Sequence, residues 1–167
     1  MGVESQPRNR VRIDLGNRRG LEGSSVYFIT GGAFNGKARW VRNHFRLQNS
    51  DTEWVPLFNE GVEEIHTSLP NVVLEGLEYA IRAALLHRDA DVRSAFKRRM
   101  QSLKEWEEEN PERKVIWIGS EIGKGIVPVD QASREWRDMT GWVYQDLAEI
   151  SQRVWLVWYG LATSLKG

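Results

Sequence analysis

The stretch that decides the fold reads Val26-Tyr27-Phe28-Ile29-Thr30-Gly31-Gly32-Ala33-Phe34-Asn35-Gly36-Lys37-Ala38-Arg39. Its first five residues are apolar, aromatic or β-branched, which is typical of a short buried strand. The glycines that follow indicate a loop, and a helical pattern then runs from Lys37 to about Leu47. The sequence therefore predicts a strand, a glycine-rich loop and a helix in direct succession.

The loop has the spacing Gly31-x-x-x-x-Gly36-Lys37 of a Walker A phosphate-binding loop. Glycines let backbone N–H groups turn toward a phosphate, the helix N-terminus adds its positive dipole end, and the lysine supplies a point charge. The alternative is a glycine-rich turn followed by an exposed lysine. We expect the nucleotide to be bound by Gly31, Gly32, Ala33, Asn35, Gly36, Lys37, Ala38 and Arg39.

Residue 38 departs from the Walker A pattern. The residue after the lysine is usually Ser or Thr, whose hydroxyl ligates Mg²⁺. Ala38 has no hydroxyl. The expected cofactor is ATP or GTP with Mg²⁺, and we expect Mg²⁺ binding to be weakened more than phosphate binding.

Further strand and helix patterns alternate along the rest of the chain. Strands are expected at residues 72–75, 115–120, 154–159 and 161–165, the last of them antiparallel to its predecessor, and helices at about 77–86, 91–109 and 130–151. This alternation predicts an α/β, three-layer P-loop NTPase-like fold with a mostly parallel sheet. Residues 1–25, rich in Arg, Asn, Gly and Ser, are expected to be a flexible N-terminal extension, and residues 26–167 one P-loop nucleotide-binding domain.

The composition excludes several other classes of protein. Lys and Arg number 23 and so do Asp and Glu, so the net charge of zero gives no support for a nucleic-acid-binding surface. The absence of Cys excludes disulfides, zinc thiolate sites and a Cys nucleophile. No apolar run approaches the about 18 residues of a membrane span, and residues 1–25 contain no apolar core of a signal peptide. We expect a cytoplasmic protein.

Two segments resemble a known family, the bifunctional adenosylcobinamide kinase / adenosylcobinamide-phosphate guanylyltransferases of cobalamin biosynthesis. Thr30 to Arg39 is similar to the family's Thr-Gly-Gly-Ala-Arg-Ser-Gly-Lys-Ser-Arg, and Ser120 to Pro128 to its Asn-Glu-Val-Gly-x-Gly-Ile-Val-Pro. The helix that follows resembles Arg-x-x-Arg-Asp-x-x-Gly-x-x-Asn-Gln, with Tyr144 in place of the Asn. The resemblance implies a nucleotide-dependent kinase whose substrate is the corrinoid adenosylcobinamide, and a homo-oligomer, with trimers as the family's form.

Two carboxylates follow strands in the resembling segments. In Leu74-Glu75-Gly76-Leu77-Glu78, which is similar to the family's Leu-Asp/Glu-Cys-Leu-Thr, Glu75 is expected to hold the water shell of Mg²⁺, and Glu78 replaces the Thr. Glu121 comes directly after the strand expected at 115–120, at the sheet edge where ligands bind in α/β folds. The candidate catalytic residues are Lys37, Glu75 and Glu121; the alternative for both acids is an ordinary position in an exposed loop.

One segment of the family pattern is missing. The stretch in which the family carries its GMP-accepting His is absent between the first helix and Glu53-Trp54, and His44, His66 and His87 do not lie in that motif. The guanylyltransferase activity is therefore expected to be lost. The alternative to a kinase is a catalytically degenerate homologue that binds a nucleotide or a corrinoid, or serves as a scaffold.

Overall fold

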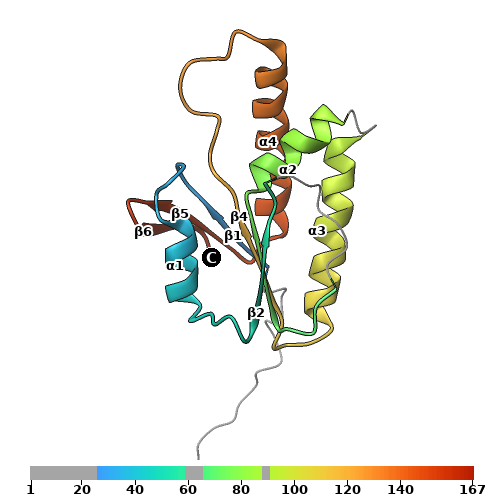
Figure 1. The fold of residues 1–167 in the computed structure, drawn as a ribbon, viewed down its shortest axis with the longest axis vertical. Helices are drawn as coiled ribbons and strands as arrows, with labels where there is room; N and C mark the ends of the chain where they lie inside the picture. Colours follow the sequence, from blue (N-terminus) through green and yellow to red (C-terminus); the bar gives the residue numbers. More distant parts are fainter. Residues whose placement is uncertain (1–25, 59–65, 88–90) are drawn as a thin grey trace, which may run out of the picture.

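The chain forms one twisted sheet with helices on both faces (Figure 1). The structure is a computed structural model and describes residues 26–58, 66–87 and 91–167. The strands are β1 (Val26–Thr30), β2 (Thr52–Pro56), β3 (Asn71–Glu75), β4 (Lys114–Ile118), β5 (Arg153–Trp158) and β6 (Leu161–Lys166). The helices are α1 (Lys37–His44), α2 (Leu77–Leu86), α3 (Val92–Glu108) and α4 (Gln131–Ile150).

The strands lie in the order β2-β3-β4-β1-β5-β6. The first five are parallel to one another, and β6 pairs with β5 in the antiparallel direction. Tyr159 and Gly160 join β5 to β6, and both have positive φ, as the tight turn between two antiparallel strands requires. The predicted fold class, α/β with a mostly parallel sheet in three layers, is confirmed.

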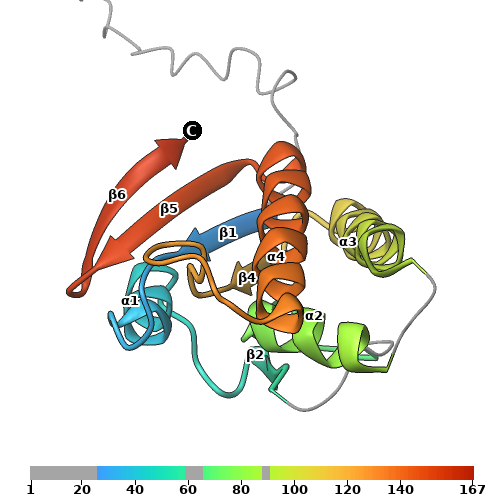
Figure 2. The same ribbon diagram turned by 90° about the horizontal axis from the view of Figure 1, so that it is seen from above.

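The two faces of the sheet are covered unequally (Figure 2). Helix α1 lies on one face, whereas α2, α3 and α4 lie on the other. Alternate residues of β1 supply the two cores, with Phe28 facing the three helices and Ile29 facing α1. The carboxyl ends of the parallel strands therefore open between α1 and α2, where a ligand is expected in this class of fold.

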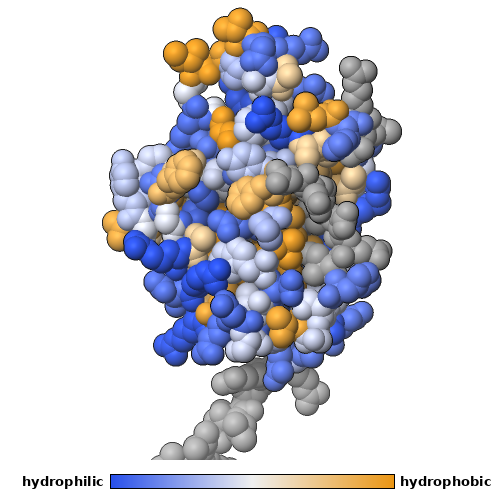
Figure 3. Space-filling view, in the orientation of Figure 1, coloured by the Kyte–Doolittle hydropathy of each residue, from blue (hydrophilic) through white to orange (hydrophobic). Residues whose placement is uncertain are grey.

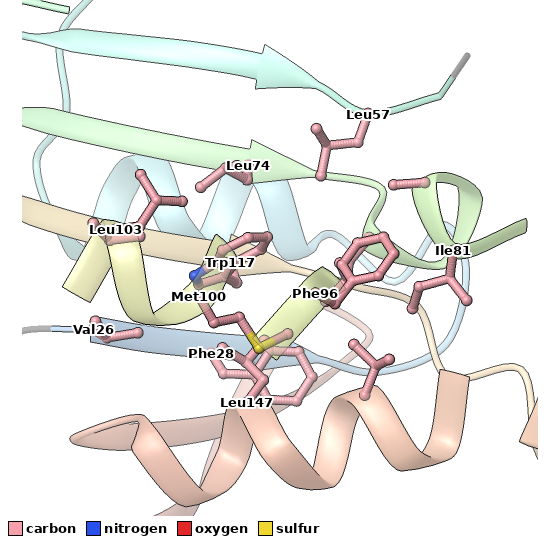
Figure 4. Packing of buried hydrophobic residues seen from close by; sticks show 14 of the residues in the cluster. Val26, Phe28, Leu57, Leu74, Ile81, Phe96, Met100, Leu103, Trp117 and Leu147 are labelled. Atoms are coloured by element: carbon pink, nitrogen blue, oxygen red, sulfur yellow. The ribbon is translucent and has the colours of Figure 1, made fainter. Parts of the chain in front are cut away.

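The larger core lies under the three helices, and Figure 4 shows its packing. Phe96 and Met100 of α3 and Leu147 of α4 converge on Trp117 of β4 and Phe28 of β1. These side chains are all nearly or fully buried. Burial of this much apolar surface is the main favourable contribution to the stability of the sheet that carries the glycine-rich loop.

The outer surface is mainly hydrophilic on the face drawn in Figure 3. Hydrophobic side chains gather at its top, over the loop between β4 and α4, where Ile126, Val127 and Val129 are exposed. Within the described residues, no helix combines the length and the hydrophobicity needed to cross a bilayer. The N-terminal extension expected at residues 1–25 lies outside the described residues.

The structure corrects several predicted boundaries. β2 was not predicted, and the first helix, expected to reach about Leu47, ends at His44 because Arg46 takes a left-handed conformation with φ 54°. The strand expected at 115–120 ends at Ile118, and the strand expected at 154–159 ends at Trp158. The antiparallel pairing of the last strand is confirmed.

Candidate functional site

The glycine-rich loop joins β1 to α1 at the carboxyl edge of the sheet. Gly31 has φ 139°, and a Cβ built on it would lie 2.1 Å from the carbonyl oxygen of Val157 in β5. Gly36, directly before α1, has φ 84°. Only glycine fits at position 31 without a clash. The close approach of the loop backbone to β5 therefore explains why this residue is glycine.

The far end of the loop is tied to the turn between β5 and β6. The carbonyl oxygen of Asn35 accepts a hydrogen bond from Gly160 N–H at 2.8 Å, and its side-chain Oδ1 accepts one from Tyr159 N–H at 2.9 Å. Asn35 Nδ2 also donates to the carbonyl of Ala33 at 3.0 Å. The loop is thus held in one shape by contacts that do not involve a ligand.

Lys37 begins α1 and folds back across the loop. Its Nζ donates to the carbonyl oxygen of Gly32 at 2.7 Å and to Oγ of Ser120 at 3.1 Å, and the residue is only 8% exposed. Burial lowers the pKa of the Lys37 ammonium, while the nearby carboxylates of Glu78 and Glu75 act in the opposite direction. The structure therefore places a buried amine, flanked by two carboxylates, at the base of the phosphate loop.

A pocket of about 370 Å³ opens beside the phosphate loop. This volume lies within the range of small-molecule sites, and the wall combines a helix N-terminus, an amine and carboxylates with aromatic rings. A phosphorylated ligand fits this arrangement because backbone N–H groups and the lysine supply its positive partners. The pocket is lined by Ala33, Phe34, Asn35, Gly36, Lys37, Ala38, Arg39, Phe58, Glu75, Gly76, Glu78, Tyr79, Ile118 and Ser120.

Glu75 reaches the pocket from the end of β3. Trp54 of β2 donates its indole N–H to Glu75 Oε2 at 2.7 Å, and the guanidinium of Arg42 lies 3.9 Å from the centre of the Trp54 ring. The carboxylate is therefore oriented by a strand that was not predicted. One oxygen of Glu75 is engaged in this way, and the residue lines the same pocket as Lys37.

Glu121 has a different position. Its backbone N–H donates to the carbonyl of Gly31 at 2.9 Å, and its Oε1 accepts from the N–H of Gly123 at 2.6 Å. The side chain does not line the pocket that contains Lys37 and Glu75. Glu121 thus joins the loop after β4 to the phosphate loop through its backbone, while its carboxylate shapes the Gly123 turn.

Glu78 lies in the pocket wall, although the sequence predicts no role for it. It is 3% exposed, and its Oε2 accepts hydrogen bonds from Ser120 N–H at 2.9 Å and from the Tyr144 hydroxyl at 3.3 Å. Burial, followed by the charge of Glu78, raises the pKa of the Tyr144 phenol well above its ordinary value, so the hydroxyl remains a donor. The signal in the sequence was the acid in place of the family's Thr at this position.

The remaining candidates lie outside the pocket. None of the three histidines lines it; His44 stacks on Trp40 with ring centres 4.4 Å apart, and His66 and His87 are exposed. Among the described residues, no group of three His, Cys, Asp or Glu side chains is arranged to hold a metal ion. Mg²⁺ keeps several waters and phosphate oxygens as ligands, so Glu75 needs no further protein ligand to fit a Mg²⁺ bound mainly through a nucleotide.

Comparison with known proteins gives matches to one family. The family described as "Cobinamide kinase / cobinamide phosphate guanyltransferase" matches residues 51–165. The "Bifunctional adenosylcobalamin biosynthesis protein CobU" of Escherichia coli strain K12 is 42% identical over 53 residues, which are 32% of this chain and 29% of that protein. CobU of Salmonella typhimurium shows the same identity and coverage, and CobP of Pseudomonas aeruginosa is 39% identical over 54 residues, 32% of this chain and 31% of that protein.

The matches differ in how much of the chain they cover. The chain spans less than a third of the length of these curated relatives, whereas the family match covers more than half of the chain. The phosphate loop at residues 31–37 precedes the matched residues, and the pocket residues from Phe58 to Ser120 lie inside them. The predicted P-loop NTPase-like fold agrees with this match, and the chain belongs to the cobinamide kinase / cobinamide phosphate guanyltransferase family.

Proposed function

We propose that this protein is a transferase that moves the γ-phosphate of ATP or GTP to the aminopropanol hydroxyl of adenosylcobinamide. The observation that carries the proposal is the buried Lys37 at the base of a glycine-rich loop that borders a pocket of about 370 Å³. Family membership supports a corrinoid as the acceptor. The chemistry needs little covalent participation by the protein, because phosphoryl transfer depends mainly on positioning and on charge neutralisation.

The proposed roles follow from the positions of the side chains. Lys37 leaves its carbonyl partners and binds the β- and γ-phosphates together with the loop N–H groups, while Glu75 holds waters around Mg²⁺. Mg²⁺, when bound, neutralises charge on the phosphate oxygens. Glu121 is proposed as a substrate-side residue because it follows β4 at the edge where ligands bind.

The guanylyltransferase activity is proposed to be lost. Covalent transfer of GMP to the protein requires a nucleophile beside the phosphates. Support comes from the three histidines, none of which lines the pocket described here. Incubation with labelled GTP and adenosylcobinamide phosphate tests the proposal, and a labelled protein band or formation of the GDP-linked corrinoid would contradict it.

The first test of the kinase proposal is calorimetric titration with ATP and with GTP, with and without Mg²⁺. We expect Lys37→Ala to raise the nucleotide Kd by about 10- to 100-fold, because a hydrogen bond to a charged group contributes about 1.5–3 kcal/mol. Thermal unfolding should show that the variant remains folded.

Lys104→Ala is the matched control for this titration. Lys104 lies on α3 and pairs with Glu108 at 3.5 Å, away from the phosphate loop, so its loss should leave the nucleotide Kd unchanged. Equal binding by the Lys37 variant and the wild-type protein would contradict a working phosphate loop. If nucleotide binds, ATP- or GTP-dependent phosphorylation of adenosylcobinamide is then measured directly.

A second candidate function is a binding or scaffold protein that has kept the fold and lost the reaction. Ala38 favours it, because a methyl group cannot ligate Mg²⁺ where Ser or Thr is usual. Micromolar nucleotide or corrinoid binding without turnover would identify this alternative.

We propose a homo-oligomer of the trimeric kind, supported by the exposed hydrophobic side chains of the loop between β4 and α4 (Figure 3). A kinase that uses ATP or GTP acts where these nucleotides are abundant, and we therefore propose a cytoplasmic location.

A further inference from the structure

Glu78 has a different environment on each of its two carboxylate oxygens. Oε2 is held by Ser120 N–H at 2.9 Å and by the Tyr144 hydroxyl at 3.3 Å. Oε1 accepts no hydrogen bond from any described residue, although the side chain is nearly completely buried and lines the pocket. A buried carboxylate with one fixed oxygen and one open oxygen is suited to accepting a proton from a bound hydroxyl.

The surroundings of Glu78 connect it to the phosphate loop. Ser120 receives the Lys37 ammonium on Oγ at 3.1 Å, and the same residue donates its backbone N–H to Glu78. The single proton of the Tyr144 hydroxyl is shared between the Ser120 carbonyl at 2.8 Å and Glu78 Oε2 at 3.3 Å, which closes the network. Ser120 therefore contacts both the Lys37 amine, which is proposed to bind the phosphates, and the Glu78 carboxylate.

Glu78 is also fixed through its main chain. It lies in the first turn of α2. Trp136 donates its indole N–H to the Glu78 carbonyl at 2.7 Å, which fixes the backbone of this turn. The carboxylate is thus oriented from both its side chain and its main chain.

The network joins three residues that lie far apart in the chain. Glu78, Ser120 and Tyr144 are 24 to 66 positions from one another, yet hydrogen bonds connect all three. The fold therefore assembles this polar network around the Glu78 carboxylate.

We propose that Glu78 is the catalytic base that takes the proton of the hydroxyl to which the phosphoryl group is transferred. The acceptor oxygen forms a bond to the γ-phosphorus as the bond from that phosphorus to the β,γ-bridging oxygen breaks. The nucleoside diphosphate leaves with the electron pair of the broken bond, and the acceptor proton passes to Glu78 Oε1 and from there to water. This assignment rests on the phosphoryl transfer proposed above and adds the residue that activates the acceptor.

Glu78→Gln is the variant that tests the assignment. The Gln side-chain oxygen is able to accept the same hydrogen bonds from Ser120 N–H and the Tyr144 hydroxyl, so the network is retained while the proton acceptor is lost. We expect kcat to fall by about 10²–10⁴-fold with adenosylcobinamide, while the nucleotide Kd and the thermal unfolding temperature stay unchanged. Glu78→Asp, which keeps a carboxylate, is expected to recover at least part of the lost kcat.

A second reaction tests Glu78 as the catalytic base independently of whether the acceptor is a corrinoid. Hydrolysis of ATP or GTP with water as the acceptor needs no corrinoid, and Glu78→Gln should slow it as well. Corrinoid-independent hydrolysis that depends on Glu78, without corrinoid phosphorylation, would refute the proposed substrate and keep the base. A kcat of Glu78→Gln within about threefold of wild type in both reactions, or no phosphoryl transfer at all by the wild type, would overturn the assignment.

Discussion

Ala38 presents a methyl group to the pocket at the position where a hydroxyl normally meets Mg²⁺. Its neighbour Lys37 is buried and donates to the carbonyls of Gly31 and Gly32, so the side chain proposed to bind phosphate is held in place without a contribution from Ala38. The proposed effect of Ala38 therefore concerns the metal more than the phosphates.

Ala38→Ser restores this hydroxyl. We expect the Mg²⁺ concentration for half-maximal nucleotide binding to fall by about tenfold, because even groups that only orient the metal ligands alter metal affinity by about 10- to 100-fold. The measurement is nucleotide binding by calorimetry at several Mg²⁺ concentrations, followed by turnover.

Ala33→Ser is the matched control, because Ala33 lines the same pocket from the exposed tip of the loop. An equal effect of both substitutions would show that a hydroxyl anywhere in the loop suffices. No effect of Ala38→Ser on binding or turnover would show that more than this one ligand is missing.

Single residues of the site differ in how well the sequence predicts them. Lys37 is predictable because the spacing of Gly31 and Gly36 to it is local. The role of Glu78 is not, since its partners Ser120 and Tyr144 are 42 and 66 residues away and are brought to it by the sheet order. A local sequence pattern does not show which residues so far apart in the chain come into contact.

Among the strands, too, some are predictable from their local sequence and one depends on tertiary pairing. Four of the five parallel strands have largely buried, apolar sequences and were predicted. β2 was missed because it is an edge strand, which pairs with β3 alone, and its sequence Thr52–Pro56 includes Glu53 and ends in a proline. Its function in orienting Glu75 through Trp54 follows from tertiary pairing, which no local pattern shows.

Helices α3 and α4 are joined by a polar contact beside their apolar core. Asp146 of α4 is 7% exposed and accepts two hydrogen bonds from Arg93 of α3, at 2.7 and 2.8 Å, with Lys97 at 3.4 Å. The hydrogen bonds from Arg93 are the main reason why the pKa of the Asp146 carboxyl lies below its ordinary value. The native state therefore favours the ionised carboxylate.

Asp146→Asn should lower the free energy of unfolding by about 1–2 kcal/mol at pH 7. This loss is smaller than for a fully buried ion pair, because Arg93 is partly exposed and solvent screens its charge. A depressed native pKa gives stability above the unfolded value of about 4 and loses it as the pH falls through the native value. The difference between variant and wild type, measured by urea unfolding, should therefore shrink below pH 4.

Glu108→Gln is the control for this measurement. Glu108 forms a surface pair with Lys104 one turn away on α3, and such pairs contribute about 0.5 kcal/mol or less. A similar loss of stability from both variants would argue against a special role of Asp146 between the helices.

The surface of the molecule includes one loop, between β4 and α4, that exposes several hydrophobic side chains. Ile126 and Val129 are 95% and 94% exposed, and Figure 3 shows hydrophobic side chains gathered over this loop. If the proposed homo-oligomer covers them with a second copy of the chain, the protein should sediment at a multiple of its chain mass at micromolar concentration, with about three times that mass for a trimer.

The double variant Ile126→Asp with Val129→Asp should shift the sedimenting species toward single chains, because it places charges in an apolar contact. Ser102→Asp, on the exposed side of α3, is the control that should leave the mass unchanged. A wild-type protein that sediments as a single chain would contradict the proposed assembly.

The hydrogen bonds from Tyr159 and Gly160 to Asn35 connect the proposed nucleotide site to the turn between β5 and β6. Neither residue of that turn lines the pocket, yet the loop keeps its shape by pairing with it. By thermodynamic linkage, a phosphate that stabilises the loop also stabilises the terminal hairpin, and damage to the hairpin weakens phosphate binding by the same free energy. Binding of the proposed phosphate ligand should therefore depend on the stability of the β5–β6 hairpin, although the turn of that hairpin does not line the pocket.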